Sequence, residues 1–261
     1  MTNVWRIFKY LTHLVKSIHL HGIHSPFVYQ LNEAVLQEKI PFYSFDEIES
    51  IRAKLLLTQK KIKVNDLGAG ANKKAKSLRY INRICKDSCK PPAQAQTIYR
   101  LVYHFKPNTI LELGTSLGLT TAYMAKANPK AKITSIEGAS EIAKIAKVNF
   151  EKLKIKNIDL RVSAFDQTLD AYLDSVEQLD FVFFDGNHQE EASLKYFEKC
   201  LEKASSDSIF VFDDIYWSKG MHNAWEKIKK HKKVKITIDL FHFGIIFFRE
   251  NQVKENFTVY Q

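Results

Sequence analysis

The sequence lacks several features that would place it outside the ordinary globular proteins. Its 261 residues contain no uninterrupted run of about 18 apolar residues, so no transmembrane helix is predicted. Three cysteines, Cys85, Cys89 and Cys200, cannot form a full set of disulfides, and we expect reduced thiols. The first residues have neither a continuous apolar core nor a small-residue cleavage site, so no signal peptide is predicted. These absences together predict a cytoplasmic protein.

The charged residues are unevenly distributed along the chain. Residues 1–107 carry 18 lysines and arginines against 7 acidic residues, a net charge of +11, whereas residues 108–261 carry 21 against 22. Such segregation is compatible with an acidic partner, either nucleic acid or an anionic membrane surface, and with a solvated basic surface. We favour the solvated surface. Residues 1–89 are predicted to be a basic, mostly helical extension, and residues 90–261 a catalytic domain.

The extension begins with an amphipathic helix over residues 4–20. Its apolar face is predicted to dock on the domain or on a second subunit of a homodimer, with an anionic membrane surface as the alternative. The residues of this face are Val4, Trp5, Phe8, Leu11, Val15 and Ile18. A second feature, the segment from Asp66 to Gly70, is similar to a cofactor loop. Too few residues separate it from the next such loop for a second nucleotide-binding sheet, so we interpret it as a basic loop of the extension.

The most informative segment is a buried strand, residues 109–113, that leads into a turn with Gly114 and Gly118 and then into a helix. A strand followed by a glycine turn and a helix N-terminus is a nucleotide-binding device, because glycine lets backbone N–H groups approach a ligand. Glu112, at the end of the strand, would repel a pyrophosphate and attract a cationic ligand. This argues for S-adenosylmethionine rather than a dinucleotide.

This segment resembles the first motif of the class I S-adenosylmethionine-dependent methyltransferases. Within that class the chain is most similar to the metal-dependent small-molecule O-methyltransferases of the catechol and caffeoyl-CoA type, over about residues 90–249. The resemblance implies S-adenosylmethionine as cofactor and a divalent cation such as Mg²⁺. It implies cofactor contacts by the turn, namely Glu112, Gly114, Thr115, Ser116 and Gly118.

Strands and helices alternate from about residue 90 onward, which predicts a parallel, doubly wound α/β sheet. The last two strands form a tight hairpin, so one strand is expected to run antiparallel. This is the Rossmann-like layout of the class I methyltransferases, seven strands in the order 3-2-1-4-5-7-6 with helices on both faces. The strands are predicted at residues 109–113, 132–136, 158–162, 179–184, 208–212, 234–239 and 243–249.

A second group of residues is expected to hold the adenosine part of the cofactor. Glu137, which Gly138 follows, ends the second strand and lies 23 residues past Gly114, where an acidic side chain can accept both ribose hydroxyls. After the third strand, Ala164 and Phe165 are placed where the adenine ring would lie. Phe165 could equally belong to the core.

Carboxylates follow two further strands. Asp185 ends one buried strand, and Asp213 and Asp214 end the next. Since neighbouring parallel strands bring their carboxyl ends together, these three side chains are predicted to form a divalent metal site, with Asp185 also near the cofactor. The O-methyltransferases have Asp-Asn at the second position, and Asp214 replaces that Asn here.

His188 lies three residues after Asp185, where the O-methyltransferases have a lysine that serves as base. Imidazole exchanges protons near neutral pH, so His188 and Asp185 are predicted as the catalytic residues. The substitution leaves two mechanisms open, a metal-assisted reaction with a different base or a metal-independent one. The function predicted is methyl transfer to an oxygen of a small molecule. An RNA methyltransferase and a catalytically idle binding module are the alternatives.

Overall fold

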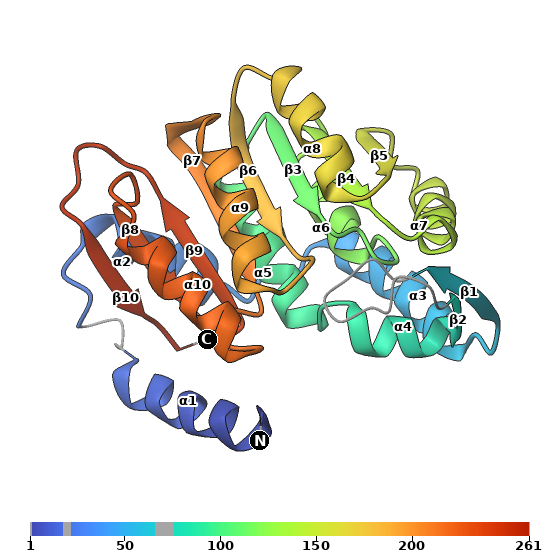
Figure 1. Cartoon of the computed structure of the whole chain (residues 1–261), viewed down its shortest axis with the longest axis horizontal. Helices are drawn as coiled ribbons and strands as arrows, with labels where there is room; N and C mark the ends of the chain where they lie inside the picture. The colour runs from blue at the N-terminus through green and yellow to red at the C-terminus, as the bar shows by residue number, and fades with distance from the viewer. Residues whose placement is uncertain (1, 18–21, 66–75, 261) are drawn as a thin grey trace. The chain divides into compact units, whose positions relative to one another are not determined.

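The computed structural model describes residues 2–17, 22–65 and 76–260. The chain folds into two compact units, one formed by Lys39–Tyr172 and the other by Met1–Glu38 together with Leu173–Gln261. Figure 1 shows the elements of both units by label. The predicted boundary at residue 89 lies inside the first unit, and it stays a prediction.

The Lys39–Tyr172 unit contains a three-stranded parallel part of the sheet. Strand β3 pairs with β4 from Thr109↔Lys132 to Leu113↔Ile136, and β4 pairs with β5 from Ile133↔Ile158 to Glu137↔Val162. This confirms the predicted 3-2-1 half of the strand order. The elements are α3 (Tyr43–Leu57), β1 (Lys61–Asn65), β2 (Lys76–Tyr80), α4 (Ile81–Ser88), α5 (Pro92–Phe105), β3 (Thr109–Leu113), α6 (Leu119–Ala127), β4 (Lys132–Glu137), α7 (Ser140–Lys152) and β5 (Ile158–Val162), with α8 (Phe165–Asp174) beginning at its end.

The second unit carries the other half of the predicted order. Within the sheet its strands lie in the order β6-β7-β9-β8-β10, and among the described strands of this unit only β9 runs antiparallel to its neighbours. The predicted 4-5-7-6 half and the single antiparallel strand are therefore confirmed. The elements are α1 (Thr2–Lys16), α2 (Pro26–Leu31), a π-helical turn η2 (Asn32–Leu36), β6 (Leu179–Phe184), α9 (Glu190–Leu201), β7 (Ala204–Asp213), α10 (Lys219–Lys230), β8 (Ile236–Asp239), β9 (Phe243–Phe247) and β10 (Glu255–Thr258).

Three strands of the described residues, β10, β1 and β2, were not predicted. β10 adds a strand parallel to β8 at the edge of the sheet. β1 and β2 form an antiparallel hairpin, with Lys61 opposite Tyr80 and Lys63 opposite Leu78, in a region expected to be helices and loop. Alternation of lysine with the buried Ile62 and Val64 is the period-2 pattern of a strand. The loop predicted from Asp66 to Gly70 lies outside the described residues.

Aromatic side chains fill the core between the strands and helices of the second unit. Phe184 of β6 stacks on Phe212 of β7 with ring centroids 4.2 Å apart, and Phe197 of α9 packs edge-on against Phe212. Trp225 of α10 lies so close to β9 that a Cβ on Gly244 would be 2.6 Å from its ring. Glycine at this strand position therefore permits the helix to pack closely on the sheet.

Helix α1 packs on its own unit, but through the face that was expected to be polar. His13 is buried, with its Nε2 3.3 Å from Oδ1 of Asp239, and the Nζ of Lys9 lies 3.0 Å from Nε2 of His222. The guanidinium of Arg6 lies over the Trp217 ring. Of the apolar face expected to dock, Val4, Phe8, Leu11 and Val15 are exposed, Trp5 is half-buried, and Ile18 lies outside the described residues.

The partners of Asp239 explain why this face docks. Its carboxylate accepts hydrogen bonds from the Tyr216 hydroxyl at 2.7 Å, the Phe241 amide at 2.9 Å and the Trp225 indole at 3.3 Å. Burial alone would raise the pKa of Asp239, but hydrogen bonds from His13, Phe241 and Tyr216 outweigh it and lower the pKa. A buried carboxylate with these donors favours the histidine face of α1 over the apolar one. Docking on a second subunit stays a prediction.

None of the helices in the described part of the chain is both long and apolar enough to cross a bilayer.

Candidate active site

The turn after β3 adopts backbone conformations that few residues favour. Gly114 has a φ of 106°, Ser116 of 48° and Gly118 of 79°. A Cβ on Gly118 would lie 2.6 Å from the Phe150 ring and 3.1 Å from Ala146, both on α7. Helix packing and the left-handed backbone therefore both require glycine at position 118, immediately before α6. Ser116 holds the same left-handed conformation without being glycine, which is typical of functional turns.

Glu112 lies below this turn and is fully buried. Its Oε2 accepts hydrogen bonds from the Thr121 and Ser135 hydroxyls, each 2.5 Å long, and the Thr115 hydroxyl lies 2.5 Å from that of Ser135. Burial raises the pKa of Glu112 to about 7, although the two hydroxyl hydrogen bonds oppose the shift. The carboxylate thus joins β3, β4, α6 and the turn, and it has no surface open to solvent.

Glu137 connects the ends of two neighbouring strands. Its Oε2 accepts a hydrogen bond from the Ser116 amide and its Oε1 one from the Ala139 amide, both 2.8 Å long. The Ser163 amide donates to the Glu137 carbonyl at 3.0 Å, which joins the end of β5 to the same edge. The predicted cofactor residues of this unit therefore gather at the carboxyl ends of β3, β4 and β5, with Gly138, Ala164 and Phe165 half-buried beside Glu137.

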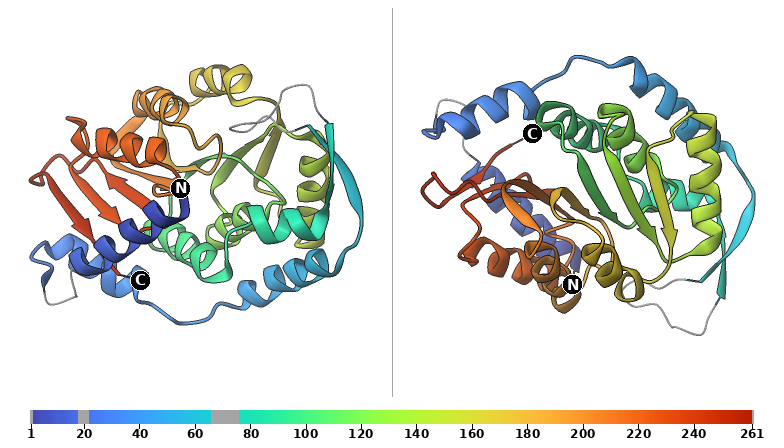
Figure 2. Two further views of the ribbon diagram at one scale, coloured as in Figure 1. Left: turned by 60° about the horizontal axis from the view of Figure 1, so that its bottom comes forward. Right: turned by 90° about the horizontal axis from the view of Figure 1, so that it is seen from above.

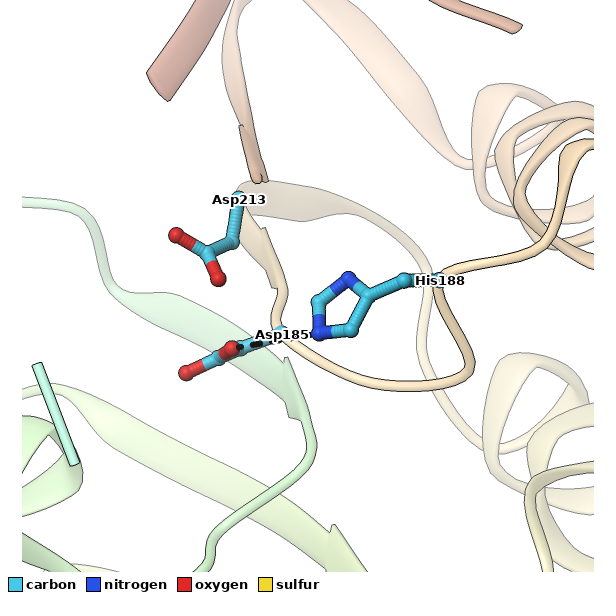
Figure 3. A group of neighbouring side chains, drawn as sticks. All are labelled: Asp185, His188 and Asp213. Carbon is cyan, nitrogen blue, oxygen red and sulfur yellow. Dashed lines mark ion pairs between the residues drawn. The ribbon is translucent and has the colours of Figure 1, made fainter. Parts of the chain in front are cut away.

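A second group of polar side chains follows β6 and β7 in the other unit. Parallel pairing sets Phe184 opposite Phe212, so the residues after them, Asp185 and Asp213, are adjacent. Ligand atoms of Asp185, Asp213 and His188 all lie within 4.8 Å of one another (Figure 3). The Nε2 of His188 is 4.0 Å from Oδ1 of Asp185. Asp213 is 1% exposed, while Asp185 and His188 are half-buried and accessible to a ligand.

Asp214 is not a member of this group, although the sequence analysis placed it in the metal site. Its φ is 53°, its amide donates to the His242 carbonyl at 2.9 Å, and its carbonyl accepts from the Trp217 amide at 2.8 Å. The left-handed conformation, which Asp and Asn tolerate better than other side chains, reverses the chain directly after Asp213. Residue 214 therefore has a backbone role at this turn, and its part in the metal site stays a prediction.

Thr121 and Ser135, which donate hydrogen bonds to Glu112, were not among the predicted site residues. The signal that could have found them is a pair of small hydroxyl residues within otherwise apolar buried segments, since a buried carboxylate needs donors. The chain is thus an α/β protein with a glycine turn after β3 and an acidic residue at the end of β4, and with a pair of carboxylates next to a histidine after β6 and β7.

Comparisons with known proteins agree with this description of the fold and its acidic residues. Residues 111–215, which contain every acidic residue of both groups, match the family model described as a methyltransferase domain. The mouse catechol O-methyltransferase domain-containing protein 1 (Mus musculus) is 27% identical over 133 residues, 50% of this chain and 51% of that protein. The chain thus matches about half the length of this curated relative.

Solved structures show the same fold. An O-methyltransferase from Bacillus cereus in complex with SAH superposes with a TM-score of 0.57 at 17% identity, covering 85% of this chain and 97% of that one. The O-methyltransferase TomG from Streptomyces achromogenes, involved in tomaymycin synthesis and solved with SAM, gives 0.57 at 16% identity, with 85% and 94% covered. The resemblance to S-adenosylmethionine-dependent methyltransferases is confirmed: the chain has their α/β fold, and its residues 111–215 match the methyltransferase-domain model.

Proposed function

We propose that the protein transfers the methyl group of S-adenosylmethionine to an oxygen of a small molecule with the help of a divalent cation. The observation that carries the proposal is the convergence of Asp185, Asp213 and His188 after two strands of the methyltransferase domain. Two carboxylates with a neighbouring imidazole are a donor set that suits Mg²⁺ or Mn²⁺.

The residues around the β3 turn fit the cofactor. A carboxylate offers about four lone-pair directions, so Glu137 can accept ribose hydroxyls while it holds the Ser116 and Ala139 amides. Those amides in turn fix its orientation. S-adenosylmethionine supplies an electrophilic methyl group on a sulfonium. Glu112, which is buried and linked to Thr115 through Ser135, acts as a positioning residue for the turn.

At the second group, Asp185 and Asp213 would hold the cation, which lowers the pKa of a bound acceptor hydroxyl. His188 accepts the hydroxyl proton as the acceptor oxygen forms its bond to the methyl carbon and the sulfur–carbon bond breaks. Asp185, 4.0 Å from the imidazole, stabilises the resulting imidazolium. Alignment of acceptor and methyl group then contributes through proximity.

Replacement of Glu137 tests the cofactor assignment. Glu137→Ala is expected to weaken S-adenosylmethionine binding by about 1.5–3 kcal/mol, because hydrogen bonds to a charged acceptor are lost. Titration calorimetry measures the change. Glu151→Ala, which removes an exposed carboxylate from α7, is the matched control and should leave the affinity unchanged. An unaltered affinity in Glu137→Ala, with the fold intact by circular dichroism, would remove the ribose assignment.

A further inference from the structure

Helix α1 presents a continuous apolar face away from the unit on which it packs. We call this face the α1 stripe. Its residues recur at steps of three and four, as on one side of a helix, and Phe8, Leu11 and Val15 are 66%, 55% and 86% exposed. Exposed apolar side chains are ordinary when scattered, but a contiguous patch of large ones marks an interaction surface. The α1 stripe consists of Val4, Ile7, Phe8, Leu11, Leu14 and Val15.

The opposite face fixes the helix in this orientation. His13 is buried against Asp239, Tyr10 packs edge-on against Phe241 with ring centroids 4.9 Å apart, and Trp5 packs on His222. In Figure 2 the helix at the N-terminus, in dark blue, lies beside the red strands of the same unit. Turning α1 to bury the stripe would expose His13 and remove a partner from the buried Asp239. The stripe is therefore a prearranged surface.

The charges of α1 indicate what covers the stripe. The helix contains Arg6, Lys9 and Lys16, and it contains no acidic residue. Arg6 and Lys9 contact Trp217 and His222 on the packed face, whereas Lys16 is exposed. Two copies packed stripe to stripe would therefore offer no carboxylate of α1 to pair with the exposed lysines. An anionic lipid surface attracts a helix that carries three cations and no acidic residue.

The composition of the helix agrees with a lipid partner. Trp5 and Tyr10 lie at the two edges of the stripe, where amphipathic rings suit the boundary between headgroups and acyl chains. Fifteen residues are too few to span a bilayer, which needs about 20, so the helix would lie in the plane of the surface. We infer that α1 is an interfacial helix that attaches the protein to anionic membranes through the stripe.

This attachment has a consequence for the site. α1 contacts Tyr216, Trp217 and His222, which belong to the segment directly after Asp213 and Asp214. Binding through the stripe would hold that segment next to the lipid surface. An acceptor that partitions into membranes would then be presented to this unit.

Vesicle flotation of the full-length protein tests the inference. Vesicles of phosphatidylglycerol and phosphatidylcholine are compared with vesicles of phosphatidylcholine alone. The wild type is expected to float with the anionic vesicles, and Phe8→Ser/Leu11→Ser/Val15→Ser to lose at least about tenfold in partitioning. Lys16→Gln should lower the preference for anionic vesicles about fivefold.

The matched control removes three exposed apolar side chains elsewhere, as Leu57→Ser/Leu78→Ser/Val253→Ser, and should float like the wild type. Because all six positions are exposed, the variants should fold, which melting curves and calorimetry with S-adenosylmethionine verify. A wild type that stays unbound overturns the inference. So does a concentration-dependent dimer of the wild type that the stripe variant converts to a monomer, because the stripe would then be a subunit interface.

Discussion

Asp213→Asn is expected to weaken Mn²⁺ binding at least about a hundredfold. The substitution keeps the shape of a side chain that is 1% exposed at the end of β7, so it removes a charge without creating a cavity. Of the two carboxylates, Asp185 alone would be left to hold the cation. Paramagnetic resonance of Mn²⁺ added to the full-length protein measures the dissociation constant. Turnover with an ortho-dihydroxy aromatic as the probe acceptor should fall in parallel, and excess chelator should abolish it.

Two further variants sharpen this test. Asp207→Asn makes the same change at an exposed position of the same strand and should leave Mn²⁺ binding unchanged. Asp214→Asn should also bind Mn²⁺ like the wild type, since residue 214 is not among the grouped ligand atoms. Full turnover in excess chelator would contradict the metal. Loss of Mn²⁺ affinity in His188→Ala would make the histidine a ligand, whereas an altered pH profile of turnover with intact Mn²⁺ binding supports its role as base.

The parts of the fold that the sequence predicted are those with strong local signals. β3, β5 and β6 have the predicted bounds, because β3 and β6 are short, largely apolar runs and β5 alternates apolar with charged residues. α5 begins at Pro92, directly after Pro91, and ends at Phe105, because the next residue, Lys106, has a left-handed φ of 50°. β10 was not predicted, because it is an edge strand of only four residues whose first two are exposed, and so its sequence shows little alternation of apolar and polar residues.

The docking of α1 could not be predicted from its apolar residues. The pattern identified the helix and its apolar face correctly, but which face is buried depends on the partners available at the contact. Asp239, more than 200 residues away in the chain, offers a buried carboxylate to His13. A sequence pattern carries no information on so distant a partner, and a satisfied buried charge can decide the orientation of a helix.

The candidate site likewise has features that the sequence predicts and features that it does not. Parallel strands dictate that Asp185 and Asp213 meet, and the spacing alone was enough to predict it. The left-handed backbone at Asp214 and the arrival of His188 in the group depend on turn geometry, which a single sequence specifies weakly. The burial of Glu112 likewise depends on how α6 and β4 close over it, and its predicted contact with a cationic ligand stays a prediction.

The second large effect expected is a pH dependence of stability caused by Glu112. The pKa of Glu112 is about 7 in the folded protein and 4.5 as its ordinary value, because burial favours the neutral form. The folded state therefore binds the proton more tightly than the unfolded state. Glu112 therefore contributes most to the free energy of unfolding below pH 4.5. Its contribution falls between pH 4.5 and pH 7, and above pH 7 it is about 3 kcal/mol lower than below pH 4.5.

Glu112→Gln removes this dependence, because the amide stays neutral at every pH while the Thr121 and Ser135 hydroxyls can still donate to its oxygen. Measured by urea denaturation without cofactor, the free energy of unfolding of the variant relative to the wild type should rise by about 3 kcal/mol between pH 4.5 and pH 8. Glu151→Gln, at an exposed position, should follow the wild-type curve at every pH. A constant difference between Glu112→Gln and the wild type over this range would mean that Glu112 is ionised throughout. The carboxylate would then act on the turn as a fixed negative charge rather than as a neutral hydrogen-bonding group.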